Sequence, residues 1–142
     1  MVDAMVRGWR AQQTARGLRD DTITARERLV RNFLEFTNEY PWQWTAAHVD
    51  DWSLSMTSER HLAPSTIRGY QTDLRLFTEF LTDNARYGWV SACEKEFGPG
   101  AYPVAIVHEW NSIAHLQSYE GNPEARPFTR EELQRFIDYA DD

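Results

Sequence analysis

The chain has 142 residues, of which 42% are hydrophobic and 13% aromatic, so it has enough apolar side chains for a packed core and extensive disorder is excluded. It contains no apolar run of the roughly 20 residues needed to cross a bilayer, and its first ten residues lack the apolar stretch of a secretory signal. The single cysteine, Cys93, excludes an internal disulfide, so a cytoplasmic location is expected.

The net charge is −7, which argues against a protein that coats nucleic acid through its overall charge. Residues 1–84 carry a net charge of −2 and residues 85–142 carry −5. Fourteen of the fifteen basic residues are arginine, whose forked guanidinium suits phosphate and guanine. Any nucleic-acid-binding surface is therefore expected to be local and built from arginine.

Two helices are predicted before residue 39. The first covers residues 3–16, with Met5, Trp9 and Gln12 facing inward, and Gly17 ends it as a C-terminal cap. The second begins near Asp20 or Asp21, whose carboxylates favour the positive end of a helix dipole, and runs to about residue 38. Its inward positions are Ile23, Val30, Phe33, Leu34 and Thr37.

Two more helices are predicted before residue 85. Thr45 is a favourable N-cap for a short helix whose buried row is Val49, Trp52 and Met56. The next helix follows Pro64 and keeps helical spacing through its apolar positions, Ile67, Tyr70, Leu74, Phe77 and Leu81. Its opposite face is polar and carries Arg68, Gln71, Thr72 and Arg75. Four helices joined by short loops predict a compact all-α bundle over residues 1–84.

The second and fourth predicted helices resemble each other. A shift of 44 positions places Thr22 on Thr66, Ile23 on Ile67 and Arg31 on Arg75. Amphipathic helices share apolar spacing by default, but the Thr-Ile pair and the matched arginines are not required by that spacing. We interpret the two segments as a pseudo-repeat of one helical unit.

The second half of the chain is predicted as an extension and a linker. A short helix is expected around Trp89, Val90, Cys93 and Phe97, and a further helix over residues 104–118, so that residues 85–119 form a helical extension of the bundle. Residues 120–127 have the composition of a linker. Residues 128–142 begin with a capping box, Thr129 with Glu132, and are expected to be the first helix of a second domain.

At this point the sequence resembles the N-terminal part of tyrosine recombinases, the phage-type integrases. The likeness lies in the doubled Thr-Ile helices, the tryptophan-rich short helix between them, and the linker that leads to RPFTREEL. The stretches RYGWVSACEKEFG and HEWNSIAHLQSYEGNPEARPFTREEL are similar to integrases of actinobacterial mobile elements in particular.

The resemblance implies a core-binding domain with a SAM-like fold, which holds one side of a DNA duplex while a catalytic domain holds the other. The implied partners are double-stranded DNA and other recombinase protomers on the recombination site, with no membrane and no small-molecule substrate. The family's catalytic domain supplies arginines, a His-x-x-Arg motif and a tyrosine nucleophile. No histidine of this chain has arginine at its third following position, so we expect no catalysis by this chain and no cofactor.

The predicted DNA contacts come from two sources. The polar face of the fourth helix and its first turn give Ser65, Thr66, Arg68, Gln71 and Arg75. The resemblance adds outward positions of the second helix, with Arg26 beside the main set of Thr22, Thr24, Arg28 and Arg31. Two alternatives stay open: the charged faces are ordinary solvated surfaces, and Thr22 and Thr66 only start helices. The usual serine or threonine cap is absent from both helix starts, where Arg19 and Ala63 stand instead.

Other candidate sites are weaker. Cys93, His108 and His115 have zinc-ligand chemistry but lack the compact spacing of a structural zinc site, so no metal is expected. The tryptophans, Trp42, Trp44, Trp52, Trp89 and Trp110, lie in apolar periodic segments and are expected in the core.

The sequence therefore predicts a DNA-binding domain of a site-specific recombinase, in which the arginine-bearing sides of the second and fourth helices form one outer surface. A helical protein-interaction module that never touches DNA is the alternative, because a fold alone does not decide function.

Overall fold

The computed structural model describes residues 1–114, which contain six α-helices and two 3₁₀ turns but no β-strand. The elements are α1 (Val2–Ala15), α2 (Asp20–Thr37), η1 (Pro41–Gln43), α3 (Ala46–Ser58), α4 (Pro64–Thr82), α5 (Asn84–Tyr87), α6 (Trp89–Phe97) and η2 (Glu109–Asn111). The all-α class is confirmed for this part of the chain. The predicted linker at 120–127 and the predicted helix at 128–142 lie outside the described residues.

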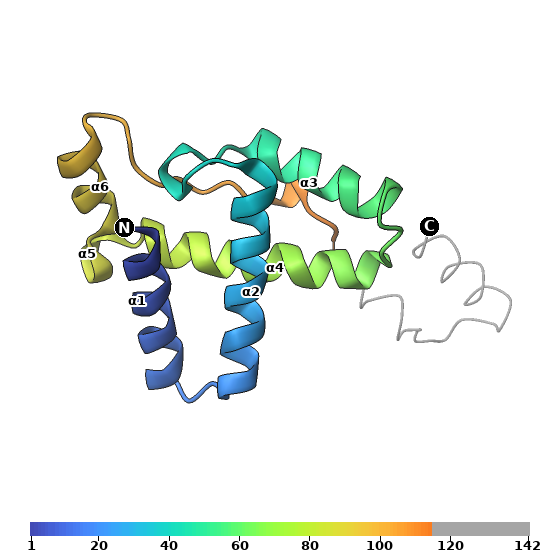
Figure 1. The fold of residues 1–142 in the computed structure, drawn as a ribbon, viewed down its shortest axis with the longest axis horizontal. Helices are drawn as coiled ribbons and strands as arrows, with labels where there is room; N and C mark the ends of the chain where they lie inside the picture. The colour runs from blue at the N-terminus through green and yellow to red at the C-terminus, as the bar shows by residue number, and fades with distance from the viewer. Residues whose placement is uncertain (115–142) are drawn as a thin grey trace, which may run out of the picture.

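The four longest helices form two antiparallel pairs, one lying across the other (Figure 1). The first pair is α1 with α2, and the second is α3 with α4, so that α4 passes behind α2. The short helices α5 and α6 follow at the end of α4 and lie next to the N-terminus. None of the helices in residues 1–114 is both long and apolar enough to span a bilayer.

Helix ends follow the predicted capping chemistry in two places. Gly17 has φ +84°, and the amides of Gly17 and Leu18 donate to the carbonyls of Thr14 and Gln13, the hydrogen-bond pattern of a Schellman motif. At the start of α3, the His48 amide donates to the Thr45 hydroxyl at 3.4 Å. The Thr45 amide in turn donates to His48 Nδ1 at 2.9 Å, which closes a capping box with histidine in the place usually taken by glutamate.

The core lies where the two helix pairs cross and is largely aromatic. Phe33 of α2 meets Trp44 and Trp52 edge to face, with ring centroids 4.8 and 4.9 Å apart. Trp9 of α1 meets Phe77 of α4 at 5.0 Å. The predicted buried rows of α1 to α4 are confirmed in the main, although Leu34, Thr37 and Tyr70 are only half-buried. In α1 the buried amide is Gln13, not the predicted Gln12.

The predicted helix over 104–118 is wrong for residues 104–114. After α6 the chain turns at Pro99 and Gly100. It then returns across the molecule to α3 without regular secondary structure, and η2 forms a single turn there (Figure 1). Pro103 and the β-branched residues that follow favour extended backbone, and Ile106 and Val107 are both buried although they are adjacent. Trp110 keeps the apparent helical spacing of this segment, but it is 71% exposed. The prediction that it is a core tryptophan is therefore wrong.

Candidate nucleic-acid interface

The outer side of α4 presents a short basic face. Arg68, Thr72 and Arg75 follow each other at four and three residues, which places them on one side of the helix. We call these three residues the α4 arginine face. Arg75 pairs with Glu79 one turn later at 3.6 Å, and both side chains are largely exposed, so solvent screens this pair. Arg68 forms no ion pair with any carboxylate in residues 1–114.

A hollow of about 760 Å³ adjoins this face. One wall is the α4 arginine face, and the other is formed by the chain around η2, namely Glu109, Ser112, Ile113 and Ala114. In the part of the chain that the structure describes, the hollow thus combines two guanidinium groups and two hydroxyl-bearing residues with a single carboxylate. Guanidinium and hydroxyl groups are the side chains that most often contact phosphate oxygens. The arrangement can accept an anionic chain along its length.

Gln71 does not belong to this exposed face, and the prediction that it points outward is wrong. Its side chain is only 2% exposed. Its Nε2 donates to the Ser53 hydroxyl at 2.7 Å, and its Oε1 accepts from the Ile113 amide at 2.8 Å. Both ends of the carboxamide are therefore occupied within the protein, and the residue holds α3 and the chain after η2 against α4.

The first turn of α4 carries the two predicted hydroxyl residues. Ser65 is exposed and Thr66 half-buried, while Ala63 at the N-cap offers no side-chain acceptor. The Thr66 amide donates to the Ala63 carbonyl at 3.0 Å, which leaves the Ser65 amide as the donor available at this helix end. No side-chain hydrogen bond caps the start of α4, in agreement with the sequence prediction. The same holds for α2, where Arg19 is the N-cap residue.

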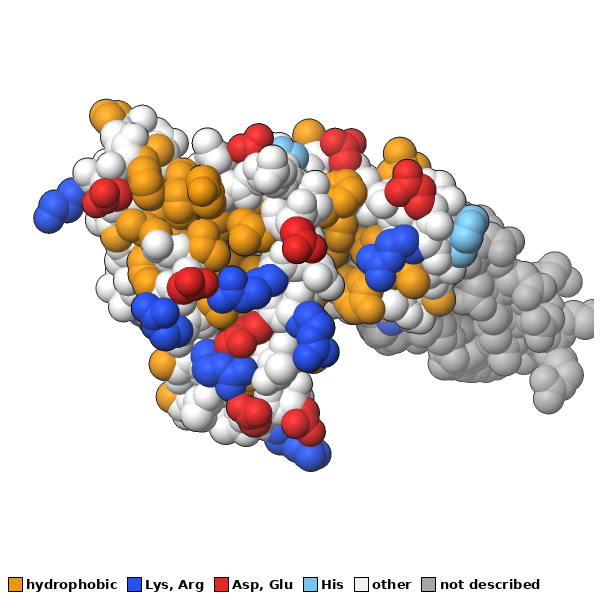
Figure 2. Space-filling view, viewed as in Figure 1, with side chains coloured by type: hydrophobic (Ala, Val, Ile, Leu, Met, Phe, Trp, Pro, Cys, Tyr) orange, Lys and Arg blue, Asp and Glu red, His pale blue; other side chains and the backbone are white. Residues whose placement is uncertain are grey.

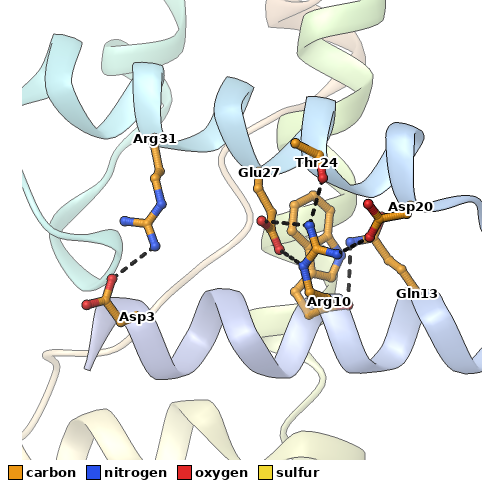
Figure 3. A network of polar contacts seen from close by, with 8 residues as sticks. Asp3, Arg10, Gln13, Asp20, Thr24, Glu27 and Arg31 are labelled. Carbon is orange, nitrogen blue, oxygen red and sulfur yellow. Dashed lines mark hydrogen bonds and ion pairs between the residues drawn. The ribbon is translucent and has the colours of Figure 1, made fainter.

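On α2, three of the residues considered for DNA contact form hydrogen bonds with α1, namely Thr24, Arg26 and Arg31; Figure 3 shows those of Thr24 and Arg31. Arg10 of α1 donates to Asp20 at 2.6 Å, to Glu27 at 2.8 Å and to the Thr24 hydroxyl at 2.9 Å. Arg31 donates to Asp3 at 2.9 Å. We call this set the α1–α2 ion-pair network. Thr24 and Arg31 accordingly lie on the side of α2 that faces α1.

The α1–α2 ion-pair network joins two guanidinium groups to three carboxylates, so it has no excess positive charge. The Arg31 guanidinium lowers the pKa of Asp3 below its usual value, and Glu27 and then Asp20 raise the pKa of Arg10. Figure 2 shows positive and negative side chains interleaved over α1 and α2, without a continuous basic surface. Thr22 and Arg28 remain exposed on α2, and Arg28 forms no ion pair in the described part of the chain.

The arginines of α2 and α4 do not form the common surface that we expected. Nε of Arg26 on α2 lies 3.5 Å from Oδ1 of Asp73 on α4, so the side of α4 that carries Asp73 faces α2. At about 100° per residue, Asp73 lies roughly 140–160° around the helix from Arg68 and Arg75. The α4 arginine face therefore points away from α2. Burial raises the pKa of Asp73, and Arg26 opposes that shift.

An exposed aromatic patch occupies another part of the surface. Tyr40, Trp42 and Phe97 form a three-ring stack, with centroids 4.9 and 4.3 Å apart and planes within 14° of parallel. Met1 and Leu34 lie beside the stack along a shallow hollow. We call these five residues the aromatic patch; Figure 2 shows the hydrophobic surface of this region. Phe97 was predicted on the apolar side of a short helix, and nothing in its spacing showed that it would be exposed.

No metal centre is evident in residues 1–114, where no three His, Cys, Asp or Glu side chains converge. Cys93 is buried, and burial raises the pKa of its thiol. Its sulfur contacts the Met1 thioether at 3.7 Å. His115, which was weighed with Cys93 and His108, lies outside the described residues.

Comparison with protein-family models, with curated proteins and with solved structures gives no match to this chain.

Proposed function

We propose that this chain is the DNA-binding part of a site-specific recombinase and that it contacts duplex DNA through the α4 arginine face. The observation that carries the proposal is the position of Arg68, which is half-buried, and Arg75, which is exposed, on one side of α4, with Arg68 free of carboxylate partners among residues 1–114. The crossed pairs of helices support the SAM-like core-binding arrangement that the resemblance implies. A cytoplasmic, bacterial setting follows from the same proposal.

The proposed surface is smaller than the one expected from the sequence. Thr24 and Arg31 are held by α1, and Gln71 is buried, so the interface centres on Arg68, Thr72 and Arg75 with Ser65 at the helix start. Thr22 and Arg28 belong to a separate exposed area of α2. The acidic charge of the rest of the chain repels DNA, and the affinity of this chain alone is expected to be low and strongly salt-dependent.

A salt titration of duplex binding tests the proposal. Binding of the 142-residue chain to a labelled duplex is measured by fluorescence anisotropy, and the double variant Arg68→Gln with Arg75→Gln is compared with the wild type. The slope of log affinity against log salt should fall by about two, because about one counterion is released for each phosphate contact. Affinity at low salt should fall at the same time.

A charge-matched control separates local contact from overall charge. The variant Arg86→Gln with Lys95→Gln also removes two positive charges, but from α5 and α6, outside the proposed face. It should leave the slope unchanged. An equal response of both double variants, or no response to the first, overturns the assignment to α4.

The aromatic patch supports a second function, association of this chain with another copy of itself. Tyr40 and Phe97 are 56% and 44% exposed, and stacked exposed rings are typical of protein contact sites. Neighbouring protomers on a recombination site would provide such a partner. Light scattering across a concentration series tests this function: Tyr40→Ser with Phe97→Ser should abolish self-association, whereas Leu54→Ser, at an exposed site on α3, should not.

A further inference from the structure

Trp110 is the large hydrophobic residue with the greatest exposure in residues 1–114, at 71%, and its position in the fold is unusual. It lies in η2, one residue after Glu109 and two before Ser112, and both of those residues line the hollow of the α4 arginine face. Consecutive Cα atoms are about 3.8 Å apart, so the backbone of Trp110 lies beside that hollow, while the indole projects into solvent and is not part of the lining.

The ring is also held in a defined orientation. The imidazole of His108 stacks on Trp110, with centroids 4.8 Å apart and planes 11° from parallel. This contact covers part of one side of the indole, while the high exposure leaves the rest of the ring system accessible. A flat, open aromatic surface is the feature on which nucleobases stack.

A buried carboxamide, that of Asn111, organises the turn that carries Trp110, and its Nδ2 also donates to the Ala46 carbonyl of α3 at 3.5 Å. Asn111 Oδ1 accepts from the His108 amide at 2.6 Å, and Asn111 Nδ2 donates to the Ile106 carbonyl at 2.8 Å. The Ser112 hydroxyl donates to the His108 carbonyl at 2.6 Å. Because these hydrogen bonds already order the turn, stacking of a ligand on Trp110 loses little conformational entropy there, which favours binding.

We propose that Trp110 stacks on an unpaired base of a DNA strand whose phosphates contact Arg68 and Arg75. This inference rests on the proposed function and extends it from duplex to single-stranded segments. Stacking accepts every base, so little sequence preference is expected. Among residues 1–114, Glu109 is the carboxylate that lines the hollow, and its charge opposes the strand.

The test compares a labelled single strand with the same sequence as a duplex, using anisotropy and the 142-residue chain. Trp110→Ala should weaken single-strand binding roughly five- to 150-fold, the range that corresponds to one stacked base, and leave duplex binding unchanged. Trp110→Phe, which keeps an aromatic face, should recover part of the loss. Glu109→Gln should strengthen binding of both forms.

Leu54→Ala is the matched control, because Leu54 is 65% exposed and lies on α3. Urea unfolding of each variant verifies that the fold is retained. The inference is overturned if Trp110→Ala binds the single strand as the wild type does, if it weakens both DNA forms equally, or if the wild type binds only duplex. The last result leaves the proposed function intact, whereas absence of all DNA binding removes both.

Discussion

The side-chain oxygen of Gln71 accepts a hydrogen bond from the backbone amide of Ile113, 42 residues later, at 2.8 Å. The other end of the same carboxamide donates to Ser53 of α3 at 2.7 Å. One buried side chain thus joins α3, α4 and the extended chain that forms a wall of the candidate interface.

We expect Gln71→Leu to lower the free energy of unfolding by about 1–3 kcal/mol, because it leaves the Ile113 amide and the Ser53 hydroxyl without this partner in a buried position. Urea unfolding followed by circular dichroism measures the change. Thr72→Ala, at the neighbouring and half-exposed position, should lower the free energy of unfolding by clearly less than Gln71→Leu. Equal costs for the two variants would show that the Gln71 bridge does not stabilise the fold.

The α1–α2 ion-pair network predicts a salt-dependent contribution to stability. Arg10→Met keeps the aliphatic part of the side chain but removes its contacts with Asp20, Thr24 and Glu27. We expect it to destabilise the chain more than Arg60→Met, at an exposed arginine with no ion pair in residues 1–114. The gap between the two variants should narrow at 1 M salt, because high ionic strength screens exposed charges. A gap that does not change with salt would contradict an electrostatic origin.

Two helical glycines predict different responses to alanine. A Cβ at Gly69 of α4 meets no atom within 4 Å, so Gly69→Ala should raise the free energy of unfolding by about 0.5–1 kcal/mol through helix propensity. A Cβ at Gly8 of α1 would lie 3.2 Å from Cζ of Phe80, whose ring is buried. Gly8→Ala should therefore gain less than Gly69→Ala or lose stability. The ranking of the two variants by urea unfolding is the measurement, and a reversed order would refute the packing of α1 on α4.

Asp73 predicts a pH effect of defined sign. Burial raises the pKa of this carboxyl in the folded protein above its usual 3.8, and Arg26 offsets only part of the shift. The folded state then binds the proton more tightly than the unfolded state, so the contribution of Asp73 to stability falls as pH rises from 3.8 through the folded pKa. Asn is neutral throughout. The stability of the wild type relative to Asp73→Asn should therefore improve on acidification from pH 7 toward 4, and urea unfolding at several pH values will show whether the difference moves that way.

The helices could be predicted because their signals are local. Gly17, Thr45 and Pro64 mark helix boundaries through backbone chemistry that needs no distant partner. The apolar rows that include Val30, Met56 and Leu74 follow the helical period and are buried. The class and most element positions follow from these features alone.

The errors arise where a long-range partner decides the outcome. Gln71 has the polarity of a surface residue, and only Ser53 and Ile113, which the fold brings to it, make its burial possible. The chain from residue 104 keeps an apolar spacing that resembles a helix, but Asn111 supplies hydrogen bonds that support an extended path. Likewise, Arg31 is outward on its own helix, yet α1 brings Asp3 to it.

The contact between the Met1 thioether and the Cys93 thiol has a practical consequence for labelling. The first residue of this chain lies beside α6 (Figure 1), and Met1 lines a hollow together with Tyr40, Trp42 and Phe97. An affinity tag or fluorophore fused ahead of Met1 would sit beside those rings and disturb the self-association assay itself. Reporter groups are better attached at exposed side chains such as Ser91 or Thr57.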